Sequence, residues 1–277
     1  MRFVFFLVIL ILFAQSVFAA KVDTISIYSF SMNKSINNVV VTPDDYLTSD
    51  LDYPVVYLLH GYGGDYTSWI NLAPQIKEFV DEMSIICVCP DGGYRSWYLD
   101  SPIDTSFKYE TYIASELLKF VDLNYRTKAD KRFRAISGLS MGGHGALYLT
   151  CRHPDLFGAA GSSSGGVDLR KFTASWDLKE KILGDTICCK QNWEDHSVVN
   201  SIGKLRKKEV QLIIDCGQQD FFLDVNRNLH ARMLELNIDH DYIERPGEHT
   251  SEYWQSSIDF HFLFFHKFFL TADNQKK

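Results

Sequence analysis

The stretch Arg134–Tyr148, RAISGLSMGGHGALY, decides the fold of this chain. An apolar run ends at Ile136, and Gly138, Ser140 and Gly142 then follow as G-x-S-x-G before a run of small, helix-compatible residues. This order predicts a strand, a sharp turn and a helix, the arrangement called a nucleophile elbow. Glycine two positions before and after the serine is a steric demand, because the serine backbone at the tip takes an unfavourable φ.

The backbone beside this turn predicts a binding place for a negative oxygen. Met141 follows the serine at the start of the helix, where its N–H has no partner within the helix and points toward a developing oxyanion. The competing interpretation is a glycine-rich turn with an incidental serine. The strand before Ser140 and the helix after it favour the nucleophile, since they supply the context that the motif requires.

Composition indicates one globular domain and excludes some partners. The chain has 277 residues, of which 46% are hydrophobic and 14% aromatic, which is enough for a full core. The formal net charge of −7 predicts no nucleic-acid partner and no electrostatic attachment to anionic lipid.

The first residues, MRFVFFLVILILFAQSVFA, have the composition of a signal peptide. Arg2 gives the positive start, Phe3 to Phe13 form an apolar core, and Val17 and Ala19 are the small residues that a signal peptidase reads. We expect cleavage after Ala19, with the next alanine as a nearby alternative. A membrane anchor is the competing interpretation, but the apolar run is short for a span. The prediction is a secreted or periplasmic protein without stable membrane association after cleavage.

The remaining chain, residues 20–277, alternates strand and helix patterns. This alternation predicts an α/β fold, with a mostly parallel twisted sheet covered by helices on both faces. Polar residues 168–209 interrupt the rhythm and are predicted to be a small lid-like insertion over the sheet. The predicted strands are 22–30, 34–41, 54–60, 84–89, the apolar run that starts at 134 and ends at 136, 158–164, 211–215 and 240–244. The predicted helices are 69–83, 109–125, 143–149, 225–236 and 251–269.

The six cysteines do not form the framework of a small disulfide scaffold. Cys87, Cys89 and Cys216 lie in apolar runs and are expected as buried free thiols. Cys188 and Cys189 lie in a polar segment, and the sequence leaves their pairing open. The spacing of cysteine and histidine indicates no zinc site, and no cofactor is expected.

An acid and a histidine follow the serine, each just after a predicted strand. The order Ser140, Asp220, His249 is the chain order of α/β-hydrolases, and parallel sheets collect such residues at the carboxyl ends of strands. Serine is a poor nucleophile near neutral pH and needs a base, which an imidazole supplies. The carboxylate would hold the imidazole tautomer and stabilise its cation.

Other residues near these motifs are candidates for the same or neighbouring roles. Asp224 is the rival acid, but it is expected in the first turn of the next helix as a capping carboxylate. The N–H of Tyr62, in the glycine-rich loop 61–64, is the second candidate oxyanion donor. Trp97 and Tyr98 follow another strand and are candidates for substrate binding, with loop packing as an equal alternative.

These motifs together resemble the esterase family of α/β-hydrolases. The family includes S-formylglutathione hydrolases of the esterase D type, feruloyl and acetyl-xylan esterases, and mycolyltransferases of the antigen 85 type. The resemblance runs over nearly all of the chain after the signal peptide. It implies Ser140 as nucleophile, Asp220 as acid, His249 as base and Tyr62 as second oxyanion donor. The segments that carry it are PVVYLLHGYGG, PDGG, GLSMGGHGA, DCGQQDFFLDVN and ERPGEHTSEYW.

The expected function is an exported serine carboxylic-ester hydrolase that acts on acetyl or feruloyl esters of carbohydrates. Export argues against a cytosolic glutathione thioester as the substrate. The first alternative is an acyltransferase of the mycolyltransferase type, in which a sugar or glycerol hydroxyl intercepts the acyl-enzyme in place of water. The second is a binding module that keeps the fold without catalysis, which the intact serine, acid and histidine disfavour.

Overall fold

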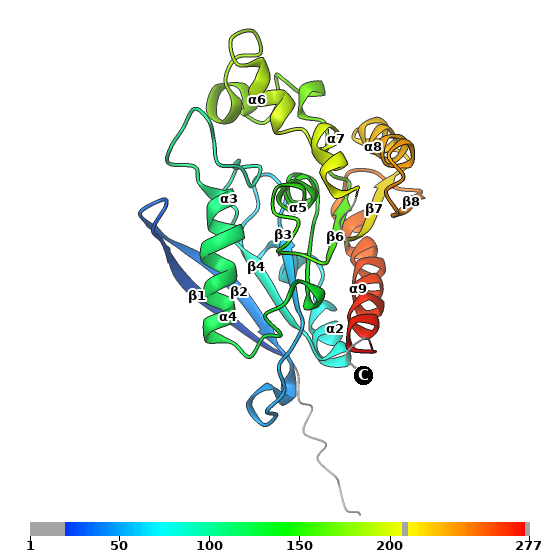
Figure 1. Ribbon diagram of the computed structural model, residues 1–277. Coiled ribbons are helices and arrows are strands. Elements are labelled where there is room, and N and C mark those ends of the chain that lie inside the picture. The colour runs from blue at the N-terminus through cyan, green and yellow to red at the C-terminus, as the bar shows by residue number, and fades with distance from the viewer. Residues whose placement is uncertain (1–19, 207–209, 275–277) are drawn as a thin grey trace, which may run out of the picture.

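The computed structural model describes residues 20–206 and 210–274, so the predicted signal peptide, residues 1–19, lies outside the described residues. The chain forms one sheet with strand order β1-β2-β4-β3-β5-β6-β7-β8 (Figure 1). The first two strands are antiparallel to their neighbours, and all later pairs are parallel. The strands are β1 Lys21–Ser29, β2 Lys34–Thr42, β3 Val55–Leu59, β4 Ile86–Pro90, β5 Arg134–Gly138, β6 Ala159–Ser163, β7 Gln211–Gly217 and β8 Asp241–Arg245.

Helices cover both faces of this sheet (Figure 1), as the alternating pattern predicted. One face packs against α3, α4, α5, α7 and α8, and the other against α1, α2 and α9. Strands β3, β4 and β5 are buried along their whole length. The helices are α1 Ser68–Leu72, α2 Ile76–Met83, α3 Tyr109–Thr111, α4 Leu118–Asn124, α5 Met141–Arg152, α6 Lys190–Asp195, α7 Val198–Ser201, α8 Leu223–Glu235 and α9 Ser251–Asn274.

The helix predicted over residues 69–83 is two helices in the structure, which corrects that prediction. Helix α1 ends at Leu72 and α2 begins at Ile76. Pro74 lies between them, and Ala73 before it leaves the helical region with φ −131° and ψ 74°. The cause is local, because a proline ring disfavours helical backbone in the residue before it.

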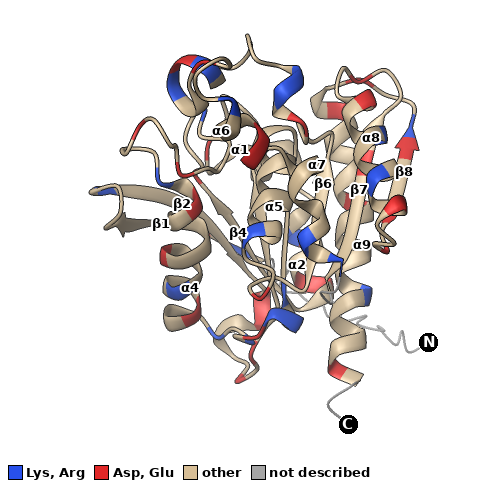
Figure 2. Ribbon diagram, turned by 45° about the horizontal axis from the view of Figure 1, so that its top comes forward, with Lys and Arg blue, Asp and Glu red and all other residues tan. Residues whose placement is uncertain are grey.

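Residues 164–206 connect β6 with β7 and include the part of the predicted lid that the structure describes. Short helices make up much of this connection, and α6 lies above the carboxyl ends of the strands (Figure 1). We call residues 168–206 the cover segment. Charged residues of both signs are interspersed over helices and loops (Figure 2). Within the described residues, no helix is long and apolar enough to cross a membrane.

A buried ion cluster fixes the helix that follows the serine. Glu110, at the start of α3, is 6% exposed and bonds to Arg152, His153 and the hydroxyl of Tyr148 at the end of α5, with oxygen distances of 2.6, 2.8 and 3.0 Å. Burial alone would raise the pKa of Glu110. The bonds to His153 and Arg152 outweigh burial and lower this pKa to about 2 from an ordinary 4.5.

We therefore expect Glu110→Gln to lower the free energy of unfolding at pH 7 by about 3 kcal/mol. A depressed carboxyl pKa stabilises the fold above the unfolded-state pKa, and this contribution is lost as pH falls from about 4.5 toward 2. Urea unfolding at pH 7 and pH 3 measures the difference. The matched control is Glu82→Gln, at an exposed position of α2. A gap between wild type and Glu110→Gln that stays constant with pH would contradict the assignment.

Candidate active site

Ser140 stands at the tip of the turn between β5 and α5, as the motif predicted. Its backbone has φ 53° and ψ −114°, a conformation that side-chain-bearing residues rarely adopt. Gly142 is required beside it, because a Cβ there would lie 2.2 Å from the carbonyl oxygen of Leu59. Gly138 is equally enclosed, with Gly142 carbonyl atoms 2.4 Å from the place of its missing Cβ. The turn is therefore wedged between its own helix and β3.

The structure brings the predicted serine, histidine and acid together. His249 Nε2 lies 2.9 Å from Ser140 Oγ, and His249 Nδ1 lies 2.8 Å from Asp220 Oδ2. The carboxylate can only accept, so Nδ1 carries the hydrogen and Nε2 of a neutral ring is left to accept from the serine hydroxyl. Asp220 Oδ1 also accepts from the Phe222 N–H at 2.7 Å. Asp224 lies in the first turn of α8, as predicted for the rival acid.

Three aromatic rings enclose the imidazole. The ring centroid of Phe221 is 4.2 Å from that of His249, Trp254 meets it edge-on at 4.8 Å, and Phe222 lies at 5.2 Å. Sequence reasoning missed these residues, although Phe221 and Phe222 directly follow Asp220 and Trp254 lies five positions after His249. Their packing restricts rotation of the ring, so its nitrogens stay aligned with Asp220 and Ser140.

Two backbone donors lie beside the serine. The loop after β3 approaches Ser140 closely, since a Cβ on Gly61 would be 3.6 Å from the serine Cβ. Among the residues that the structure describes, the N–H groups of Tyr62 and Met141 have no hydrogen-bond acceptor. Both N–H groups predicted as oxyanion donors therefore have no acceptor within the described protein.

A cavity of about 810 Å³ opens at Ser140 and His249. One part of its wall is apolar and aromatic, and another part carries hydroxyl and amide groups. Sites that combine such walls bind molecules with an apolar part and a hydroxylated part. The apolar lining includes Leu72, Pro74, Leu139, Trp176, Phe221 and Trp254, and the polar lining includes Ser68, Asn71, Ser251 and Gln255.

Trp97 and Tyr98 do not line this cavity, which corrects the expectation that they contact substrate there. They are 1% and 0% exposed. The Tyr98 hydroxyl donates to the carbonyl of His60 at 3.0 Å, so this buried side chain holds the start of the loop after β3 in place. Trp97 packs against Trp176, a wall of the cavity, with ring centroids 5.6 Å apart. Their effect on the site is indirect.

Two residues of the cover segment bridge the loops on either side of the cavity. Trp176 and Asp177 both have φ 55°. The Asp177 carboxylate accepts from the Tyr62 hydroxyl at 3.3 Å and forms an ion pair with Arg95. The Trp176 ring stacks on Phe221 at 6.1 Å. This bridging pair links the loop that carries Tyr62 to the loop that carries Asp220, a contact that no local sequence pattern predicts.

A second serine, histidine and aspartate lie hydrogen-bonded in the core. Ser137 Oγ is 2.7 Å from His261 Nδ1, and His261 Nε2 is 2.6 Å from Asp215 Oδ2. All three are at most 1% exposed, so substrate does not reach them. Burial raises the pKa of Asp215, but its bond to His261 outweighs burial and the pKa lies below its usual value. Ser163, which bonds this carboxylate at 3.0 Å, also accepts the Ser140 N–H on its carbonyl at 2.9 Å.

Two other histidines near the motifs, His60 and His144, have structural roles. His60 Nε2 accepts from the Gly92 N–H at 2.8 Å. His144 Nε2 donates to the His196 carbonyl at 2.8 Å. Burial lowers the pKa of His144 to about 4, so its ring is neutral at pH 7. Neither ring is bonded to Ser140, whose hydroxyl pairs with His249.

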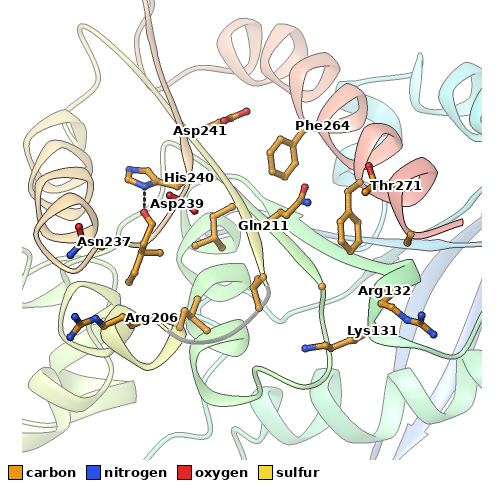
Figure 3. A pocket seen from close by; sticks show the side chains of 17 residues that line it. Lys131, Arg132, Arg206, Gln211, Asn237, Asp239, His240, Asp241, Phe264 and Thr271 are labelled. Carbon is orange, nitrogen blue, oxygen red and sulfur yellow. Dashed lines mark hydrogen bonds between the residues drawn. The ribbon is translucent and has the colours of Figure 1, made fainter. Parts of the chain in front are cut away.

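A second cavity, of about 660 Å³, lies at the amino ends of β7 and β8 (Figure 3). Gln211 and Asp241, the first residues of β7 and β8, line it. His240 faces it, and its Nδ1 donates to the Ile238 carbonyl at 2.7 Å. None of the predicted site residues lies there.

In the described parts of the chain, no group of three or more His, Cys, Asp or Glu side chains is placed to hold a metal ion.

This sheet, with a serine, histidine and acid joined at the carboxyl ends of its strands, defines an α/β-hydrolase fold. The chain matches the family model described as "Putative esterase" over residues 29–265, and it belongs to this esterase family.

Individual relatives agree with this membership. An esterase of Mycobacterium tuberculosis (strain H37Rv) is 32% identical over 243 residues, which cover 79% of this chain and 53% of that protein. The chain thus matches about half the length of that relative. The diacylglycerol acyltransferase/mycolyltransferase Ag85B of Mycobacterium leprae is 38% identical over 247 residues, covering 74% of this chain and 73% of that protein. A solved ferulic acid esterase structure superposes with TM-score 0.78 at 28% identity, covering 91% and 99% of the two chains.

The close packing of Gly142 against the Leu59 carbonyl can be tested by substitution. Gly142→Ala places a methyl group against the Leu59 carbonyl, and we expect it to lower the free energy of unfolding by about 3 kcal/mol. Gly203→Ala is the matched control, because its Cβ would meet only the Leu236 side chain at 3.5 Å. Thermal and urea denaturation compare the two variants. Equal stability of Gly142→Ala and wild type would show that the turn is not wedged as described.

Proposed function

We propose that this protein is an exported carboxylesterase-type serine hydrolase, with Ser140, His249 and Asp220 as its catalytic residues. The observation that carries the proposal is the continuous line of hydrogen bonds from Asp220 through His249 to Ser140, at 2.8 and 2.9 Å, at the edge of a cavity. Export rests on the signal-peptide pattern of residues 1–19.

The proposed first half-reaction forms an acyl-enzyme. Ser140 Oγ attacks the ester carbonyl while His249 Nε2 accepts the hydroxyl proton, and Asp220 stabilises the imidazolium that results. The N–H groups of Tyr62 and Met141 stabilise the negative oxygen of the tetrahedral intermediate, and losing one such donor typically costs about 3 kcal/mol of barrier. His249 then returns its proton to the leaving alcohol. In the second half-reaction, water repeats this sequence on the acyl-enzyme and releases the free acid.

The lining of the cavity supports acyl esters of carbohydrates as the substrate class, with acetyl and feruloyl as the acyl groups. Trp176, Phe221 and Trp254 give flat apolar surfaces, on which either an aromatic acyl group or a sugar ring packs. Asn71 and Gln255 give amide donors and acceptors for sugar hydroxyls. The similarity to a ferulic acid esterase, at 28% identity, points in the same direction.

Acyl transfer is the second candidate, and one comparison favours it. The chain is 38% identical over 247 residues to an enzyme named diacylglycerol acyltransferase/mycolyltransferase. Both reactions share the acyl-enzyme and differ only in the acceptor, which is water in one and a sugar or glycerol hydroxyl in the other. The choice depends on how well the cavity binds an alcohol in place of water.

Substitution of the two candidate acids tests the proposed catalytic residues. We expect Asp220→Asn to lower kcat for p-nitrophenyl acetate by about 10⁴-fold, because the imidazole loses the partner that fixes its tautomer. Asp224→Asn is the matched control, four positions away in the first turn of α8, and should leave kcat nearly unchanged. Ser140→Ala sets the level of no catalysis. A large loss in Asp224→Asn with a small loss in Asp220→Asn would overturn the assignment of the acid.

Product analysis separates hydrolysis from transfer. With p-nitrophenyl acetate as donor, we expect one acetic acid for each p-nitrophenol released, and the same ratio after glycerol or methyl glucoside is added. Chromatography of acetylated acceptor against free acid makes the measurement. Acetylated acceptor as the main product at modest acceptor concentration would make the protein a transferase. A comparison of acetylated with feruloylated oligosaccharides as kcat/KM then defines the acyl group.

A further inference from the structure

Cys188 and Cys189 form an exposed pair of adjacent thiols in the cover segment. Their Sγ atoms lie 2.8 Å apart, and both cysteines are free in the structure. Cys188 is exposed and Cys189 is half-buried. The pair lies at the end of the turn that joins Leu183 to α6, and the mechanism proposed above uses neither thiol.

The other four cysteines are buried, and burial makes their thiols unreactive. They are all buried, with no more than 2% of the side chain exposed, and behave as small apolar side chains: Cys87, Cys89, Cys151 and Cys216. Burial raises the pKa of Cys151 to about 12, which keeps that thiol protonated and unreactive. Reagents in solution therefore meet only the pair at the cover segment.

Bonds around the turn hold the two thiols in place. The Cys189 N–H donates to the Asp185 carbonyl at 2.9 Å, and the Trp193 indole N–H donates to the Gly184 carbonyl at 3.0 Å. Gly184 has φ 86°, and a Cβ there would lie 2.8 Å from Cys189 Sγ, so only glycine leaves room for this sulfur. The turn is thus shaped around the inner thiol while the outer thiol faces solvent.

We propose that Cys188 and Cys189 are a dithiol redox site, which low-molecular-weight disulfides oxidise to a disulfide bond between the two adjacent residues. The Cys188 thiolate attacks the small disulfide, forms a mixed disulfide and releases one small thiol. Cys189 then attacks the Cys188 sulfur, closes the ring and releases the second small thiol. Two protein thiols are oxidised and one small disulfide is reduced, and the two protein protons end on the two small thiols.

The exposures of the two sulfurs give each a separate role. Cys188 is the attacking residue because it is accessible to an incoming disulfide, and Cys189 is the resolving residue because it lies beside the mixed disulfide. Ring closure across one peptide bond removes very little chain entropy, so the disulfide adds little to the stability of the fold. This site is independent of the proposed esterase chemistry.

Thiol titration and intact mass test the proposal on the purified, reduced protein. In the folded state we expect two thiols to react with Ellman's reagent, and six after denaturation. After incubation with excess oxidised glutathione, the wild type should show no reactive thiol in the folded state, a mass lower by two hydrogen atoms, and no attached glutathione. A digest should place the new bond within the peptide that holds both cysteines.

Two variants separate the roles and make the outcome decisive. Cys189→Ser should stop at the mixed disulfide and keep one glutathione on Cys188. Cys188→Ser should react much more slowly, because its remaining thiol is half-buried. Stable glutathione on the wild type, equal reactivity of both variants, or oxidation without loss of these two thiols would each overturn the proposal. Far-UV circular dichroism checks that both variants are folded.

Discussion

The backbone of one residue, held at φ 53° and ψ −114°, is the constraint on which the rest of this structure depends. Such a conformation persists only where the surroundings over-determine it. Here Leu59 and Gly142 meet in van der Waals contact, the Ser140 N–H is bonded to the Ser163 carbonyl, and the helix begins at the very next residue. The serine side chain lines the cavity, where its hydroxyl pairs with His249.

The backbone of Ser140 is also bonded to a buried network of polar side chains. Strand β6 provides the carbonyl that holds the serine backbone, and the hydroxyl of the same Ser163 is bonded to Asp215. Asp215 is in turn paired with His261 of α9, so the strand, the closing helix and the turn are tied by one buried polar network. Removing one partner of a buried hydrogen-bonded pair is costly, because the other polar group is left without a partner. The network therefore makes the turn part of the core.

Local signals were sufficient for much of this architecture. The strand–turn–helix at Ser140 and the order of acid and histidine are patterns of adjacent residues and strand ends, and both are present in the structure. The surroundings of residues that contact distant parts of the chain could not be predicted from the sequence. Trp97 and Tyr98 were misplaced because a pair of aromatic residues in a loop looks the same whether it lines a cavity or lies beneath it. The contact between Asp177 and Tyr62, 115 positions apart, left no trace in either local pattern.

The bridging pair has a consequence for how a ligand reaches the serine. Trp176 contacts Phe221 beside Asp220, while Asp177 bonds Tyr62, so a movement of the bridging pair would break contacts with both loops at once. Such a movement would disturb the alignment of Ser140 with His249 and Asp220. Trp176 lines the cavity that contains Ser140, so moving this residue to admit a ligand would cost its contact with Phe221.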